Sequence, residues 1–68
     1  MIDGKKFKRY RKAAGLSIPQ LAERLGMTRQ AMWRIENEMK DPSLATAALI
    51  AHEMNCKVDD FLKAVRTA

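Results

Sequence analysis

Apolar residues recur along the 68-residue chain at the three- and four-residue spacings of amphipathic helices, in five short segments. Gly15, Gly26, the stretch 37–42 and Asn55 separate these segments, and such residues often end helices. The pattern predicts helices over about 3–14, 17–25, 28–36, 43–54 and 58–65. Because no convincing strand pattern is present, we expect an all-α fold, one domain of five helices over residues 1–68.

The second and third segments begin with residues that cap helices. Ser17 and Gln20 have the spacing of a capping box, in which each side chain accepts a hydrogen bond from the other residue's backbone N–H. Pro19 falls in the first turn, where a missing N–H costs little, although proline disfavours helical angles at Ile18. Thr28 is the expected N-cap of the third helix.

The same spacing indicates which side of each helix is buried. The buried face of the first helix combines Phe7, Tyr10, Arg11 and Ala14. That of the fourth helix comprises Leu44, Ala47, Ile50, Ala51 and Met54. That of the fifth comprises Val58, Phe61, Leu62 and Val65. Leu49 lies on another side of the fourth helix, where a leucine is either an isolated exposed residue or part of a subunit interface.

Charge favours a polyanionic partner. The net charge is +5 and the pI is about 9.8, which points to nucleic acid first and to an anionic membrane second. Six cations and no acid lie in the stretch 5–12. This run is either a solvated face that attracts DNA diffusely or a set of direct phosphate contacts. A membrane-binding helix is the weaker interpretation, because Phe7 and Tyr10 are needed in the core.

Length and composition exclude several other classes. A chain of 68 residues has a modest core and no room for a deep substrate cleft beside it. With Cys56 and His52 as its single cysteine and histidine, it has no disulfide and no metal site of usual spacing. No catalytic pair is present, so we expect no enzyme, cofactor or small-molecule substrate. Without a long apolar run or a signal peptide pattern, we expect a cytoplasmic protein with no membrane association.

The stretch 18–36 has the features of a helix-turn-helix motif. It places two helices of about two turns each around a short turn at Gly26, with the small Ala22 where the helices cross. If the apolar residues pack inward, one side of the second of these helices carries only Arg29, Gln30, Trp33 and Arg34. A free helix of this diameter fits the major groove of DNA.

From Phe7 to Leu62 the chain resembles the lambda-repressor-like helix-turn-helix family, of the Cro/C1 or XRE type. The residues that carry the resemblance are Arg11, Leu16, Leu21, Ala22, Leu25, Gly26, Thr28, Ile35, Glu36, Pro42, Ser43, Leu44, Ile50, Ala51 and Phe61. The resemblance implies a compact DNA-binding domain whose recognition helix, about 28–36, lies in the major groove.

The resemblance also implies individual roles. The residues that stand where family members meet base edges or nearby phosphates are Thr28, Arg29, Gln30, Trp33 and Arg34. Those that stand where members contact the DNA backbone are Ser17, Asn37 and Lys40. Arg11 and Glu36 stand where members commonly form an ion pair beneath the DNA-facing surface.

Four residues depart from the family pattern. Ile18 replaces a polar residue that members use for a phosphate contact, and Lys57 replaces a residue that would cap the last helix. Glu38 occupies a loop position where glycine is usual, and its charge would repel phosphate. Trp33 is bulky for a groove-facing position, so it contacts a base methyl, stacks on a sugar or packs on Met39.

Together these features predict a transcriptional regulator, a repressor of the Cro/C1 kind that binds a palindromic operator as a homodimer. Leu49 is the candidate dimer contact. The alternative is a protein-interaction module such as an antitoxin, which would use the surfaces around Leu49 or Phe61 and bind DNA only secondarily. A stoichiometric protein partner in the purified material would favour this alternative.

Overall fold

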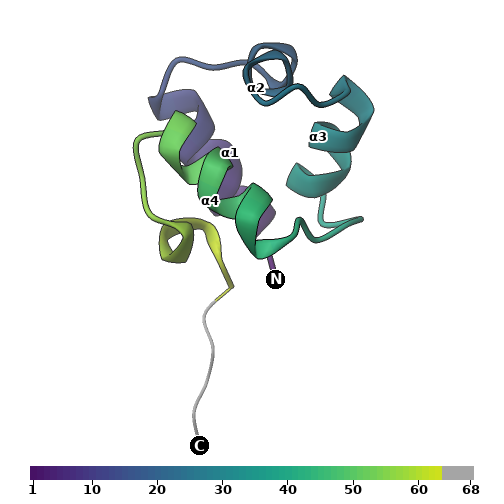
Figure 1. Cartoon of the computed structure of the whole chain (residues 1–68). Helices are drawn as coiled ribbons and strands as arrows, with labels where there is room; N and C mark the ends of the chain where they lie inside the picture. Colours follow the sequence, from purple (N-terminus) through teal and green to yellow (C-terminus); the bar gives the residue numbers. More distant parts are fainter. Residues whose placement is uncertain (64–68) are drawn as a thin grey trace, which may run out of the picture.

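The computed structural model describes residues 1–63, and it is all-helical as the sequence predicts. Four α-helices and one short 3-10 helix follow one another along the chain (Figure 1). Their bounds are α1 Gly4–Ala13, α2 Ile18–Arg24, α3 Arg29–Glu36, α4 Leu44–Glu53 and η1 Val58–Phe61. Within the described part of the chain, no helix has the length and apolar character needed to cross a membrane.

Each α-helix begins at a side chain that accepts a hydrogen bond from the first turn. The predicted caps at Ser17 and Thr28 are confirmed, and Asp3 and Ser43 cap α1 and α4 in the same way. The capping box of α2 is complete: Gln20 N donates to Ser17 Oγ at 3.2 Å, and Ser17 N donates to Gln20 Oε1 at 2.9 Å. Pro19 lies inside the first turn without delaying the helix, so the conflict expected at Ile18 does not shift its start.

The prediction of a fifth α-helix over 58–65 is wrong for the described residues. A 3-10 helix of four residues ends at Phe61, and Leu62 is extended and forms an isolated antiparallel bridge with Ile2. Two hydrogen bonds flank the bridge: Asp3 N donates to Phe61 O at 2.8 Å, and Lys63 N donates to Met1 O at 3.1 Å. These bonds use the backbone groups that a continuing helix would need. Val65, expected on the buried face, lies outside the described residues.

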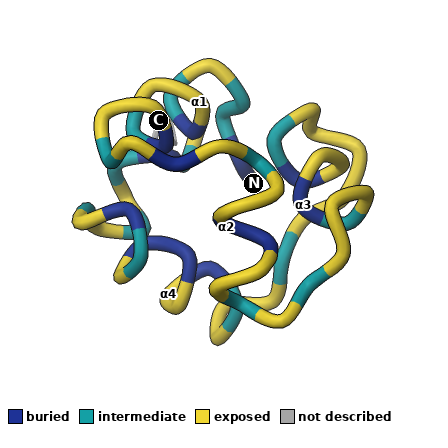
Figure 2. The backbone as a smooth tube through the Cα atoms, turned by 90° about the horizontal axis from the view of Figure 1, so that it is seen from above, coloured by how far each residue is buried: buried dark blue, intermediate teal, exposed yellow. Residues whose placement is uncertain are grey.

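The core gathers between the helices, whose buried stretches face the middle of the fold in Figure 2. At its centre, Phe7 of α1 and Phe61 of η1 are fully buried and pack edge to face, with ring centroids 5.5 Å apart. This contact joins the two ends of the described chain across the core.

The predicted buried face of α4 is right except at its first residue. Ala47, Ile50, Ala51 and Met54 are buried, but Leu44 is 80% exposed. Leu44 is the N-terminal residue of α4 and lies at the margin of the apolar stripe, where no neighbouring element covers it. The helical period alone places it with the core because the period does not show where neighbouring elements end.

Candidate nucleic-acid interface

α2 and α3 pack against each other around a tight turn. Gly26 has a φ of +65°, a conformation that costs other residues energy, and Met27 N then donates to Ala22 O at 2.8 Å. The inward sides of the two helices bury Leu21, Ala22, Met32 and Ile35. The turn and these contacts fix the angle between α2 and α3.

With its inward side buried, α3 presents its opposite side to solvent. The exposed residues there, which we call the reading face, are Arg29, Gln30, Trp33 and Arg34. Trp33 is 48% exposed, which is unusual for so large an apolar side chain. Thr28 is also exposed at the N-terminus of α3, where its hydroxyl accepts a hydrogen bond from Ala31 N at 3.0 Å. The reading face therefore combines two cations, an amide and an aromatic ring.

Arg11 and Glu36 form an ion pair behind the reading face. Arg11 Nε lies 2.7 Å from Glu36 Oε1, and Arg11 Nη2 lies 3.3 Å from Oε2, so the contact is bidentate. Arg11 Nη1 also donates to Leu16 O at 2.8 Å. The side chains are only 9% and 10% exposed. This network ties α1 to the loop before α2 and to the end of α3, and therefore helps to hold α3 in position.

The loop after α3 is shaped by Asn37 and Glu38. Asn37 Nδ2 donates to Trp33 O at 2.9 Å and so closes the helix. Glu38 has a φ of +61°, in the region where glycine is favoured. Its carboxylate lies 2.6 Å from Lys63 Nζ and accepts a hydrogen bond from Gly4 N at 3.0 Å. Lys63, and after it the Gly4 N–H, holds the pKa of Glu38 below its ordinary value. The charge expected to repel phosphate is thus locally compensated.

The three residues predicted to meet the DNA backbone are all exposed, two of them at helix ends and one in a loop. Ser17 caps the N-terminus of α2, Asn37 follows α3, and Lys40 lies in the loop that leads to α4. In the sequence, Ser17 precedes the helix-turn-helix motif, and Asn37 and Lys40 follow it. Lys40 forms no ion pair with any residue in the described range 1–63.

Comparison with known proteins decides the family. The family model described as helix-turn-helix matches residues 7–61, which is most of the chain. The chain belongs to the Cro/C1-type helix-turn-helix family. The resemblance stated from sequence is therefore confirmed. Within this family, the pair of helices α2 and α3 is the helix-turn-helix motif.

Curated relatives include helix-turn-helix regulators from methanogenic archaea. An uncharacterized HTH-type transcriptional regulator of Methanocaldococcus jannaschii is 40% identical over 56 residues, covering 82% of this chain and 85% of that protein. A protein of the same organism, named provisionally as an HTH-type transcriptional regulatory protein, is 38% identical over 61 residues, or 90% of this chain. A similarly named protein of Methanobrevibacter smithii is 34% identical over 65 residues, or 91% of this chain. The chain spans only 17% and 21% of the lengths of these last two relatives. No solved structure matches the chain significantly.

This member of the helix-turn-helix family also has an apolar surface away from the reading face. Leu49 is 58% exposed on α4. The other exposed residues of α4, which together with it we call the outer face of α4, are Leu44, Ala45, Ala48 and His52. Sequence reasoning assigned Leu44 to the core and so missed its place here. The available signal was that α4 is apolar on nearly all sides, which is typical of a helix covered on both faces.

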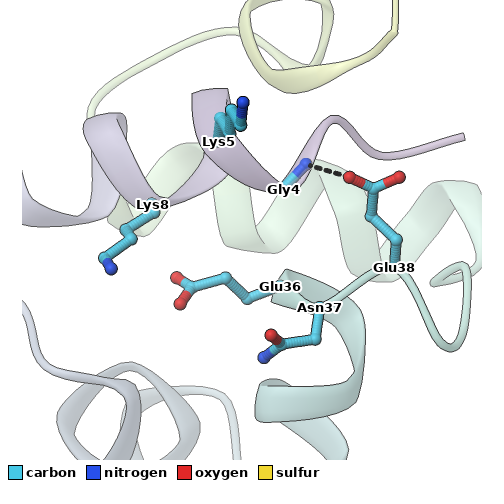
Figure 3. Close-up of a pocket in the computed structure, with 6 residues that line it drawn as sticks. All are labelled: Gly4, Lys5, Lys8, Glu36, Asn37 and Glu38. Atoms are coloured by element: carbon cyan, nitrogen blue, oxygen red, sulfur yellow. Dashed lines mark hydrogen bonds between the residues drawn. The ribbon is translucent and has the colours of Figure 1, made fainter.

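A second feature missed from sequence is a notch where α1 crosses the end of α3. The residues that line it are Gly4, Lys5, Lys8, Glu36, Asn37 and Glu38 (Figure 3). The basic run signalled that α1 carries cations, but not which of them lie beside α3. That distinction requires the tertiary crossing of two helices distant in sequence.

Proposed function

We propose that this protein binds double-stranded DNA sequence-specifically and represses transcription as a Cro/C1-type regulator. α3 enters the major groove with its N-terminal end deepest, so that Thr28 and the reading face meet base edges. The observation that carries this proposal is the reading face itself. Its side chains are exposed while the opposite side of α3 is buried and held by Arg11 and Glu36. Contacts with bases therefore require no change in the core.

The chemistry of the reading face suits base recognition. An arginine such as Arg29 can donate two hydrogen bonds to guanine O6 and N7, and Gln30 can pair with adenine N6 and N7. Trp33 offers an apolar ring edge to a thymine methyl group. Ser17, Asn37 and Lys40 contact phosphates on either side and so fix the register of α3. No cofactor is needed for any of these contacts.

The outer face of α4 supports a homodimer on a palindromic operator. A single domain with few base contacts gains specificity when two copies bind two half-sites. Leu49, with Leu44 near it in sequence, supplies exposed apolar surface that a second copy would cover. A two-fold arrangement of this kind would place the same residues of both copies in contact.

The same outer face supports a second candidate function, a protein-interaction module such as an antitoxin. In that case a different protein covers Leu44 and Leu49, and DNA binding is secondary. The two candidates differ in what the reading face does, because only the first requires Arg29 and Gln30 to discriminate between DNA sequences.

Selection of bound duplexes from a random DNA pool tests the proposal. Enrichment of a palindrome is the expected result, because it requires both base recognition and two-fold symmetry. Trp33 is the single tryptophan of the chain, so a change in its fluorescence on adding the selected duplex reports contact at the reading face. Absence of any enriched sequence, together with a stoichiometric protein partner in the purified material, would favour the interaction module instead.

A further inference from the structure

The cations of the basic run do not occupy equivalent places in the fold. Arg11 is buried in its ion pair with Glu36 and is not available to a ligand. Lys5 and Lys8 are exposed and line the notch beside the end of α3, which has a volume of about 290 Å³. The notch also includes Asn37, one of the residues we propose to contact a phosphate.

The notch exists because α1 and α3 approach each other closely. A Cβ atom added at Gly4 would clash with the carbonyl oxygen of Glu36, so only glycine permits this crossing. The Glu38 carboxylate binds Gly4 N from the same loop. The start of α1 is thereby held against the end of α3, and the lysines of its first two turns lie beside the recognition helix.

The two lysines of the notch have different electrostatic surroundings. At the Lys5 end, the Asp3 carboxylate accepts a hydrogen bond from Lys5 N at 3.0 Å, and Glu38 accepts one from Gly4 N at 3.0 Å. At the Lys8 end, the lining carboxylate is Glu36, which is neutralised by Arg11 at 2.7 Å. Glu38 is likewise paired, with Lys63, so the carboxylate that distinguishes the two ends is Asp3, which forms no ion pair within residues 1–63 and lies near Lys5.

Side-chain directions agree with this difference. In Figure 3, the Lys8 ammonium and the Asn37 amide extend on the same side of the notch as the Glu36 carboxylate, whereas Lys5 extends the other way. Asn37 Nδ2 donates to Trp33 O, which uses one of the two amide protons and leaves the second for another acceptor. Lys8 and Asn37 thus present donors on the same side of the notch, beside the C-terminus of α3 and flanking the Glu36 carboxylate in this view.

We propose that Lys8 and Asn37 bind one phosphate of the DNA backbone next to the end of the recognition helix. This site rests on the proposed function, because its ligand is the backbone of the DNA whose bases the reading face contacts. Lys5, one turn away on the same helix, contributes only to the diffuse attraction. The contact anchors α1 on the DNA and adds a register point that the helix-turn-helix motif itself does not contain.

The test compares Lys8→Gln with Lys5→Gln, which remove the same charge from the same helix. Kd for the selected duplex is measured at several salt concentrations. Losing one phosphate contact reduces the slope of log K against log salt by about 0.9, which is about eightfold in affinity at 0.1 M salt. We expect this for Lys8→Gln, and for Lys5→Gln a loss below about twofold with the slope nearly unchanged. Lys8→Arg retains the charge and should retain the slope, and circular dichroism melts verify folding of all three variants.

Duplexes with one neutral methylphosphonate each locate the phosphate. At the position that Lys8 contacts, wild type and Lys8→Gln should bind the neutral duplex equally well, because the interaction is already absent. At all other positions the difference between them should persist. Equal losses and equal slopes for Lys8→Gln and Lys5→Gln would overturn the contact while leaving the proposed function intact. A wild-type chain that prefers no duplex sequence would overturn both.

Discussion

α3 and α4 bury similar apolar faces but present opposite surfaces to solvent. The reading face of α3 carries Arg29, Gln30 and Arg34 around a single aromatic ring, whereas the outer face of α4 consists of leucines, alanines and one histidine. The exposed cations of α3 suit a polyanion such as DNA. When they neutralise phosphates, counterions are released from the DNA, and this release favours binding. Exposed leucines lower the free energy of a complex only when another apolar surface covers them and removes their contact with water. In both helices the inward residues set the fold, whereas the outward residues determine which kind of partner the surface suits.

The largest effect should come from breaking the support behind the reading face. Glu36→Ala leaves Arg11 charged and nearly buried, so we expect the free energy of unfolding to fall by about 3–5 kcal/mol. The double change Arg11→Met with Glu36→Leu should cost less, because no charge remains buried without a partner. Urea and thermal unfolding of the three proteins measure this. Unchanged stability of Glu36→Ala would mean that the ion pair contributes only as a surface contact.

The outer face of α4 is tested by Leu49→Glu. If a second copy covers this face, the charge should weaken self-association by about 2–3 kcal/mol for each leucine lost, with operator binding weakened in parallel and folding retained. Met39→Glu is the matched control for self-association only, since Met39 is also exposed, at 65%, but lies in the loop after α3 beside Lys40. Sedimentation with and without the operator duplex measures the wild type and both variants. An unaltered dimer for Leu49→Glu, or a wild type that is monomeric with and without DNA, rules out this interface.

The reading face should lose discrimination, not only affinity, when its bidentate donors are removed. Arg29→Ala and Gln30→Ala should each cost about 1–3 kcal/mol on the operator and less on scrambled DNA. Lys40→Ala should lower both affinities and leave their ratio unchanged, because a phosphate contact carries no sequence information. The Kd values of each variant for the operator and for the scrambled duplex measure this ratio. If both α3 variants preserve the ratio, the protein-interaction module becomes the better account.

The smallest effect concerns Glu38, in the loop after α3. Lys63 and the Gly4 N–H lower its pKa in the folded chain, so its contribution to stability is present above the unfolded value and is lost as pH falls through the lowered pKa. A carbon-detected NMR titration should place the pKa of Glu38 below its ordinary value of 4.5, and Lys63→Gln should move it back toward that value. A titration unaffected by Lys63→Gln would show that the backbone N–H alone shifts the pKa.

Local signals predicted most of the fold. The caps at Ser17 and Thr28 and the helical period located four of the elements, since these features depend on residues close in sequence. The spacing of Val58, Phe61 and Leu62 also fits a helix, but the backbone of Leu62 pairs with Ile2, 60 positions away. No local pattern contains that pairing.

Predictions about the candidate site depended mainly on the family resemblance and less on local sequence patterns. Periodicity placed Arg11 on the inward side of α1, while its pairing with Glu36 came from the family resemblance. The same resemblance marked Glu38 as a departure, yet gave no sign that Lys63 and Gly4 would compensate its charge. The exposure of Leu44 and the placement of Lys8 beside Asn37 also required the packing of helices remote in sequence.

The bridge between Ile2 and Leu62 has a consequence for how this unit can be combined with other polypeptides. Because Lys63 N bonds to Met1 O at 3.1 Å, the start of the chain and residue 63 are neighbours, and the path between them is nearly a closed loop. A unit whose entry and exit points adjoin can be inserted into a surface loop of a host protein without separating the host's strands or helices. For the same reason, new termini could be opened at an exposed loop such as that around Lys40 after residues 1 and 63 are joined by a short linker.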